Sequence, residues 1–244
     1  MSPVVSVLRK SMILAAVLTV MGAATAQAQV VAVDLGLPSG TKWANMNVGA
    51  TSPQESGLYF AWGETTGYTS ETTDGRQFDW ANYKWMAEGQ SSWKYISKYQ
   101  IDDGLTEACW YEYDGYKFAG DSLTVLEVAD DAAAANWGGD WRMPTIEEYQ
   151  ELLDNCTRKW VTIGKVSGRK FTSKKNGNAI FFPAAGCRYG ENLYGVGLGG
   201  YYWSASLSEG YSYDGCDLYF NSDDVGTDHG LRYDGLPVRA VLRY

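Results

Sequence analysis

The alternation of apolar and polar residues is most regular in the carboxyl-terminal half of the chain, where it predicts a run of antiparallel strands. Short stretches with this alternation are typical of strands that bury one face. Turn-forming residues separate them, including Asn176-Gly177-Asn178 and the glycines between residues 195 and 200. The predicted strands span residues 159–163, 168–173, 179–185, 200–206, 216–221 and 237–243.

Helical spacing of apolar residues predicts two helices ahead of most of these strands. The first runs from about residue 126 to 136 and is ended by a pair of glycines. The second begins after Thr145, which forms a capping box with Glu148 three residues later. Its apolar residues between Ile146 and Leu153 fall on one face, so we expect this helix to dock on the core.

The amino-terminal part of the chain is less regular. Residues 33–63 predict short strands broken by turns, and residues 64–120 are rich in Trp and Tyr. Two roles are open for these rings: they pack as a loop layer over the core, or they form an aromatic platform for a ligand. Packing is the commoner role of rings in long loops, and we favour it here.

The first 28 residues have the layout of a secretory signal peptide. Arg9 and Lys10 precede an apolar run that is too short to span a membrane, and Ala26-Gln27-Ala28 is a cleavage signal. We expect an exported protein, at the cell surface, secreted or periplasmic, with no membrane span. The remaining residues 29–244 predict one domain, with amino-terminal strands at 29–63, aromatic-rich loops at 64–120, and helices and core sheet at 121–244.

Charge narrows the range of partners. The whole chain has 244 residues and a net charge of −9, and the leader holds two basic residues and no acids. The exported part therefore has 216 residues (244 − 28) and a charge of −11 (−9 − 2). Phosphates select for Lys and Arg, so this acidity argues against nucleic acid as a partner. The oligomeric state is left open.

Four cysteines lie in the exported part: Cys109, Cys156, Cys187 and Cys216. In an oxidising compartment they allow two disulfides with three possible pairings, of which we favour Cys187–Cys216 with Cys109–Cys156. The alternative is that at least one pair consists of free buried thiols. Their wide spacing and the single His of the chain argue against a zinc site.

Residue patterns for catalysis are weak. His229 is the only His, it has no Ser or Cys motif beside it, and we predict it to be an exposed loop residue. Asp223, Asp224 and Asp228 are candidate calcium ligands, but their spacing differs from that of an EF-hand loop, so we expect no cofactor.

Two further acids support an alternative interpretation as a glycan-active enzyme. Glu64 and Asp79 lie next to Trp62 and Trp80 in the sequence, and sugars stack on such rings. A structural envelope protein without a dedicated ligand is the third possibility.

Six ordered segments carry a resemblance to a known family. They are "DLGLPSGTKWANMNVGA" (34–50), "NWGGDWRMPTIEEYQELLDNC" (136–156), "IFFPAAG" (180–186), "YGVGLGGYYWSAS" (194–206), "LYFNS" (218–222) and "GLPVRAV" (235–241). Together they resemble the Fibrobacter succinogenes major paralogous domain, an exported family common in Bacteroidetes and related to the C-type-lectin-like fold. The resemblance implies an α+β domain in which two helices pack on twisted antiparallel strands with long irregular loops above.

The resemblance implies no established activity. The calcium-dependent sugar-binding motifs of animal C-type lectins do not occur in this chain, and neither does the closely spaced cysteine pair of formylglycine-generating enzymes. Neither activity is therefore carried over.

The resemblance directs attention to residues 211–234. In C-type-lectin-like proteins diversified by retroelements, the variable positions lie in this region and arise from mutated adenines of Asn codons. Twelve residues fit the resulting set of amino acids: Tyr213, Asp214, Asp217, Tyr219, Asp224, Gly226, Asp228, His229, Gly230, Leu231, Tyr233 and Asp234. Ordinary drift in a tolerant loop is the alternative explanation.

We therefore predict a binding module, not an enzyme, with a recognition surface for a protein or glycan. In the strand 216–221, Leu218 and Phe220 are expected to face the core, and Asp217, Tyr219 and Asn221 to project outward. Tyrosines would anchor the ligand while Asp and His supply polar specificity. The predicted ligand-binding residues are Tyr211, Tyr213, Asp214, Asp217, Tyr219, Asp224, Asp228, His229, Leu231, Tyr233 and Asp234.

Overall fold

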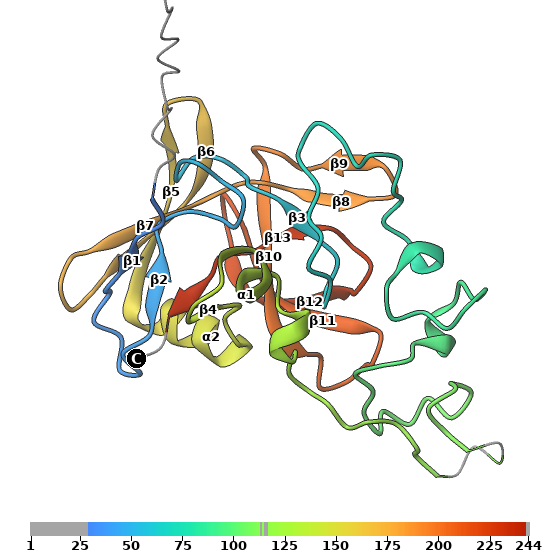
Figure 1. The fold of residues 1–244 in the computed structure, drawn as a ribbon. Helices are drawn as coiled ribbons and strands as arrows, with labels where there is room; N and C mark the ends of the chain where they lie inside the picture. The colour runs from blue at the N-terminus through green and yellow to red at the C-terminus, as the bar shows by residue number, and fades with distance from the viewer. Residues whose placement is uncertain (1–28, 113, 115–116, 243–244) are drawn as a thin grey trace, which may run out of the picture.

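The computed structural model describes residues 29–242 except 113, 115 and 116, and it is rich in β-strand (Figure 1). The proposed signal peptide lies outside the described residues. The strands are β1 (Ala32–Val33), β2 (Lys42–Ala44), β3 (Tyr59–Phe60), β4 (Trp141–Arg142), β5 (Cys156–Ile163), β6 (Val166–Ser173), β7 (Ala179–Pro183), β8 (Cys187–Tyr189), β9 (Asn192–Tyr194), β10 (Gly199–Leu207), β11 (Asp214–Asn221), β12 (Val225–Leu231), β13 (Leu236–Pro237) and β14 (Val241–Leu242). The helices are η1 (Trp80–Asn82), η2 (Trp93–Tyr95), η3 (Val128–Asp130), α1 (Ala132–Trp137) and α2 (Ile146–Asn155), where η marks a 3-10 helix.

The strands form several small antiparallel sheets. The orders are β1-β2-β14-β4, β10-β11-β12, β5-β6-β7, β13-β3 and β8-β9. Strand β14, near the carboxyl end, lies between β2 and β4 and so joins the two ends of the described chain. None of the helices in the described part is long and apolar enough to cross a membrane.

The expected C-type-lectin-like α+β fold is wrong. Strand makes up 35% of the structure and helix only 12%, and the strands are divided among small sheets instead of carrying two packed helices. The helix predicted at 126–136 is broken, because Asp131 accepts hydrogen bonds from the backbone of Ala133 and Ala134. That side chain caps a new helix, so α1 begins only at Ala132 and is six residues long.

The prediction for α2 is confirmed. The Thr145 hydroxyl accepts a hydrogen bond from the Glu148 backbone, and the Glu148 carboxylate accepts one from the Thr145 backbone. These two bonds make the expected capping box. Tyr149, Leu152 and Leu153 are buried on one face and pack into the main core.

The strands predicted from residue 159 onward are present with longer or shorter bounds, except the last. Residues 237–243 are divided into β13 and β14 because the segment between them turns Arg239 into the interior. Its guanidinium donates hydrogen bonds to the carbonyls of Ala44 and Phe181 and to Asn47 Oδ1, at distances of 2.8–3.1 Å. These bonds connect the carboxyl-terminal segment to β2 and β7.

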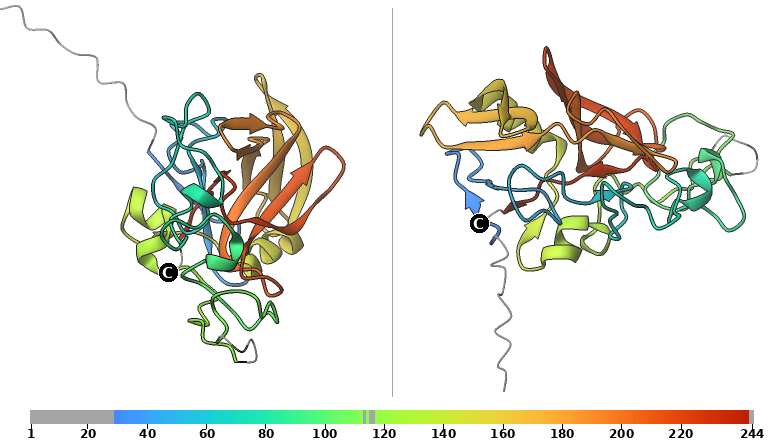
Figure 2. Two further views of the ribbon diagram at one scale, coloured as in Figure 1. Left: turned by 90° about the vertical axis from the view of Figure 1, so that its right-hand side faces the viewer. Right: turned by 90° about the horizontal axis from the view of Figure 1, so that it is seen from above.

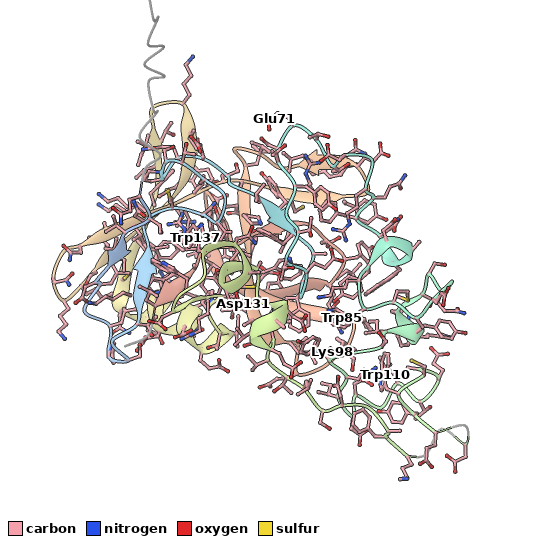
Figure 3. The ribbon with its side chains drawn as sticks, in the orientation of Figure 1. Glu71, Trp85, Lys98, Trp110, Asp131 and Trp137 are labelled. Atoms are coloured by element: carbon pink, nitrogen blue, oxygen red, sulfur yellow. The ribbon has the colours of Figure 1, made fainter. Side chains whose placement is uncertain are left out.

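The aromatic segment 64–120 forms one end of the molecule, away from the β5-β6-β7 sheet, in Figure 1 and in the view from above in Figure 2. Its rings pack among themselves, with Tyr83 and Trp110 buried. The carboxylate of Asp130 connects this segment to the core, because Lys84, Lys98 and Tyr99 all donate hydrogen bonds to it. Figure 3 shows Trp85 and Lys98 side by side there, and Lys98 donates to the Asp130 carboxylate at 2.7 Å.

The expected disulfides are absent from the structure, in which all four cysteines are free thiols. Cys156 lies in the main core at the end of α2, and Cys109 is exposed in the aromatic segment. Cys187 lies in β8 and Cys216 in β11, strands that belong to different sheets. The favoured pairings therefore join cysteines that lie in separate parts of the fold, which their spacing along the chain does not show.

Candidate binding site

The segment predicted as an irregular loop is the regular strand β12. It pairs antiparallel with β11 so that His229 lies opposite Cys216, and Asp228 opposite Asp217. Two glycines and several polar residues give this segment a low strand propensity, which is why its pattern indicated a loop. Because alternate residues of a strand point to opposite faces, the predicted site residues are divided between the two faces of the sheet.

The first face of the β10-β11-β12 sheet is turned toward α2. Leu218 and Phe220 are fully buried against this helix, which confirms their assignment to the core. Asp214, Cys216 and His229 share this face by register. They lie at the end of the sheet where α2 begins.

A hollow of about 500 Å³ lies at this end of the first face. We call it the hairpin hollow. It is lined by Thr124, Val125, Ile146, Glu147, Ser206, Leu207, Ser208, Glu209, Gly210, Tyr211, Cys216 and His229. Hydroxyl, carboxylate, imidazole and aromatic groups thus surround one space, with apolar side chains between them.

A hydrogen bond holds the imidazole at the rim of the hairpin hollow. Asp214 Oδ2 lies 2.8 Å from His229 Nδ1, and their side chains are 8% and 49% exposed. Burial raises the pKa of the Asp214 carboxyl, and the interaction with His229 opposes that shift. The buried partner therefore fixes the orientation of a ring that is half in solvent.

A stack of rings continues the rim. Tyr211 and Tyr213 lie with their centroids 5.1 Å apart and their planes at 18°, and Tyr211 lies 6.3 Å from His229. Trp93 supports Tyr213 from the aromatic segment at 5.3 Å. Tyr211 is 41% exposed, so its outer surface is available to a ligand.

The thiol of Cys216 shares a face with the Asp214–His229 pair but is not an activated nucleophile. Its Sγ donates to the carbonyl of Leu207 at 3.4 Å. Burial and then the charge of nearby acids raise the pKa of the Cys216 thiol to about 12, so it is neutral at pH 7. The geometry of the hairpin hollow offers hydrogen bonds and ring surface instead.

The second face of the sheet carries other predicted residues, and the expectation that Asp217 projects into solvent is wrong. Asp217 is only 3% exposed, although it shares this face with half-buried Tyr219. Register places Asp228 beside it on β12. Trp203, the residue opposite Asp217 on β10, is fully buried as well.

The remaining predicted residues lie at the ends of β12 or just beyond them. Tyr233 is 7% exposed, with its ring 4.8 Å from Trp80 and 5.9 Å from Tyr189, so it is a packing residue. Leu231 and Asp234 are half-buried near it, and Asp224 lies in the turn between β11 and β12. Among the residues described, no three His, Cys, Asp or Glu side chains are placed to hold a metal ion.

The acids proposed for a glycan-active enzyme have structural partners. Glu64 is 8% exposed, forms a 2.8 Å ion pair with Arg76 and accepts a hydrogen bond from the Lys84 backbone. Burial raises the pKa of the Glu64 carboxyl, and the charge of Arg76 opposes the shift. Asp79 caps η1 by accepting from the Asn82 backbone at 3.0 Å.

Several residues of the hairpin hollow were missed by the sequence interpretation. Thr124, Ile146 and Glu147 come from segments far from β12, and Ser206 and Ser208 lie at the end of β10. The capping box predicted where α2 begins in the sequence. No sequence pattern indicated that this helix start lies close to His229 in the fold. No family model, curated protein or solved structure matches the chain.

Proposed function

We propose that this chain is an exported binding module of the Fibrobacter succinogenes major paralogous domain family, which captures a protein or glycan ligand at the hairpin hollow. The observation that carries the proposal is the hollow of about 500 Å³ with Tyr211 and His229 on its rim. Its size suits a sugar unit or a side chain of a partner.

The rim residues are held in place before any ligand arrives. Asp214 orients the imidazole of His229, and the Tyr211 ring rests on Tyr213. Ordering such groups costs free energy when a ligand has to do it, so a rigid rim supports tighter binding. Tyr also offers a large contact area with little side-chain entropy to lose.

The test begins with an array of glycans and bacterial cell-surface proteins probed with the purified chain. Each ligand found is then titrated against Tyr211→Ala and His229→Ala, and against Tyr194→Ala as a control. Tyr194 is 51% exposed and does not line the hairpin hollow. We expect each rim substitution to weaken binding about tenfold or more, and the control to bind as the parent does.

Melting temperatures of Tyr211→Ala and Tyr194→Ala should match the parent, because these side chains are 41% and 51% exposed. His229→Ala leaves the buried Asp214 carboxyl without its partner, so its affinity is measured at a temperature well below its own melting temperature. Unchanged affinity in both rim variants would refute this site. An empty array would favour the structural envelope protein, and product release from a glycan would favour the enzyme.

Diversification of residues 211–234 by a retroelement is a separate hypothesis. It predicts a near-identical DNA copy of the coding region that differs only at adenines, beside a reverse transcriptase gene. Gly215 should not vary, since an added Cβ would lie 2.6 Å from the ring of Trp62. Sequencing of the surrounding genome decides the question, and absence of both the copy and the gene would reject it.

A further inference from the structure

The second face of the β10-β11-β12 sheet holds acids without compensating cations. Asp217 is 3% exposed, and its Oδ1 has no hydrogen-bond partner in the described structure. The charges that act on it are those of Asp228, Asp234 and Asp214, all of the same sign. A buried carboxylate without a partner destabilises a fold, so such a group calls for an explanation.

The neighbouring acids share this lack of cations. The Oδ1 atom of half-buried Asp234 has no hydrogen-bond partner either. Asp228 is exposed on β12 directly opposite Asp217. None of the ion pairs found among the described residues includes Asp217, Asp228 or Asp234.

Glycines leave space beside these acids. On the second face, β12 presents only Gly226, Asp228 and Gly230, since its other residues point the other way. A Cβ added to Gly226 would meet nothing within 4 Å, and one at Gly230 would lie 3.6 Å from Asp217 Oδ2. The Asp217 carboxylate thus lies in van der Waals range of the place where a side chain at residue 230 would begin, and open space is found at Gly226.

Aromatic rings form the wall of this space. Tyr219 lies opposite Gly226, and its ring centroid is 5.4 Å from that of Tyr201. The indole of Trp203 approaches the Gly230 position to 3.5 Å. We call the region bounded by Tyr201, Trp203, Asp217, Tyr219, Gly226, Asp228 and Gly230 the acidic trough.

We propose that the acidic trough binds the ammonium or guanidinium group of a basic side chain in an extended peptide segment of a protein partner. Carboxylates pair with such groups through charge-assisted hydrogen bonds, and the faces of Tyr and Trp rings attract the same cations. Divalent metal ions take oxygen ligands and gain little from rings. The mixture of acids and rings therefore suits an organic cation.

The position of β12 supports a peptide as the source of the cation. β12 is the edge strand of its sheet, so one row of its backbone N–H and C=O groups faces away from β11. In this row the N–H groups of Val225 and His229 donate to the carboxylates of Asp224 and Asp228, which leaves the backbone around Thr227 and Leu231 for a partner. An extended segment can add to such an edge by backbone hydrogen bonds while alternate side chains enter nearby pockets. A Lys or Arg on that segment would then lie next to Asp228.

This site is on the opposite face from the hairpin hollow, so its failure leaves the proposed function standing. The probe is a short fluorescent peptide of alternating Thr and Lys, compared with the same peptide carrying acetyl-lysine, and binding is measured by fluorescence anisotropy. We expect the Lys peptide to bind, and acetylation, which removes the charge, to weaken binding about tenfold or more.

Substitutions locate the binding. Asp228→Asn should weaken the Lys peptide about tenfold, and Glu88→Gln, which removes the same charge at an exposed residue outside the trough, should leave it unchanged. Tyr219→Leu tests the ring wall and should weaken binding while Tyr211→Ala has no effect. Asp217→Asn should also weaken binding. If Asp217→Asn does not fold, the result for Asp228→Asn alone tests the role of the acids.

Four results would overturn the inference. The first is that the acetylated peptide binds as tightly as the Lys peptide, and the second is that Glu88→Gln weakens binding as much as Asp228→Asn does, which would show only general attraction to an acidic protein. The third is that free N-acetyl-lysine methylamide binds as tightly as the peptide, which would remove the role of the peptide backbone. The fourth is that the protein binds calcium and Asp228→Asn abolishes this binding.

Discussion

The buried carboxyl of Asp234 should make the protein less stable as the pH rises, and Asp234→Asn should remove that effect. Burial and then the charge of Asp214 raise the pKa of Asp234 from 3.8 to about 7. A group with a raised pKa in the fold binds its proton more tightly there than in the unfolded chain. Its contribution to stability is complete below pH 3.8 and is lost as the pH rises through 7.

The size of the effect follows from the two pKa values. A tenfold change in proton affinity corresponds to about 1.4 kcal/mol. A carboxyl that titrates near 3.8 in the unfolded chain and near 7 in the fold therefore destabilises the fold by about 4 kcal/mol at pH 8. Solvent screening of the half-buried side chain makes this an upper limit.

The assay is urea denaturation of the parent and Asp234→Asn at several pH values between 3 and 8, with Glu88→Gln as the control. The difference in unfolding free energy between Asp234→Asn and the parent should be small at pH 3 and should grow in favour of the variant toward pH 8. The charge of Asp234 also raises the pKa of Asp217, so Asp234→Asn makes ionisation of Asp217 less unfavourable. This second effect also stabilises the variant relative to the parent as the pH rises. A difference that does not change with pH, or that favours the parent at pH 8, would refute the reasoning.

Three further predictions concern other parts of the fold. Arg239→Met should lower the unfolding free energy in urea by about 3 kcal/mol, because it leaves the buried carbonyls of Ala44 and Phe181 without donors; a loss below about 1 kcal/mol would contradict this role. Glu148→Gln should cost about 1–2 kcal/mol by removing the charge paired with Arg142. Burial raises the pKa of the Glu148 carboxyl, but its bonds to Arg142 lower the pKa by more, so the pKa lies below its usual value. The cost of Glu148→Gln, measured by thermal melts, should therefore fade as the pH falls through the pKa of Glu148 in the folded protein. A thiol reagent should find all four thiols in the denatured chain without reductant and react first with exposed Cys109 in the native chain; fewer titratable thiols would indicate disulfides.

The fold could be predicted from sequence where a single local pattern determines the structure. Thr145 and Glu148 located the start of α2, and the alternation around Leu218 and Phe220 identified the buried face of β11. The failures occurred where a side chain overrides the local pattern. Asp131 ends one possible helix and begins another, and inward-turned Arg239 divides the last predicted strand.

The candidate site was predictable only in part, because its geometry depends on pairing between distant segments. The sequence treated residues 211–234 as one surface, but the register that sets His229 opposite Cys216 divides them between two faces of the sheet. A shift of that register by one residue would exchange the faces. Asp217 lies opposite Trp203, and Tyr233 packs against Trp80, which is more than 100 residues away along the chain.

The boundary between the buried scaffold and the exposed edge of the sheet lies between two neighbouring strands. β11 is held on both sides, since Leu218 and Phe220 pack into the core and Gly215 lies against Trp62. β12 pairs with β11 alone, and the side chains of Thr227, Asp228 and His229 are exposed. Substitutions on such an edge remove few packing contacts and cost little stability. A recognition surface needs this combination, in which a fixed strand sets the positions of side chains that are free to change.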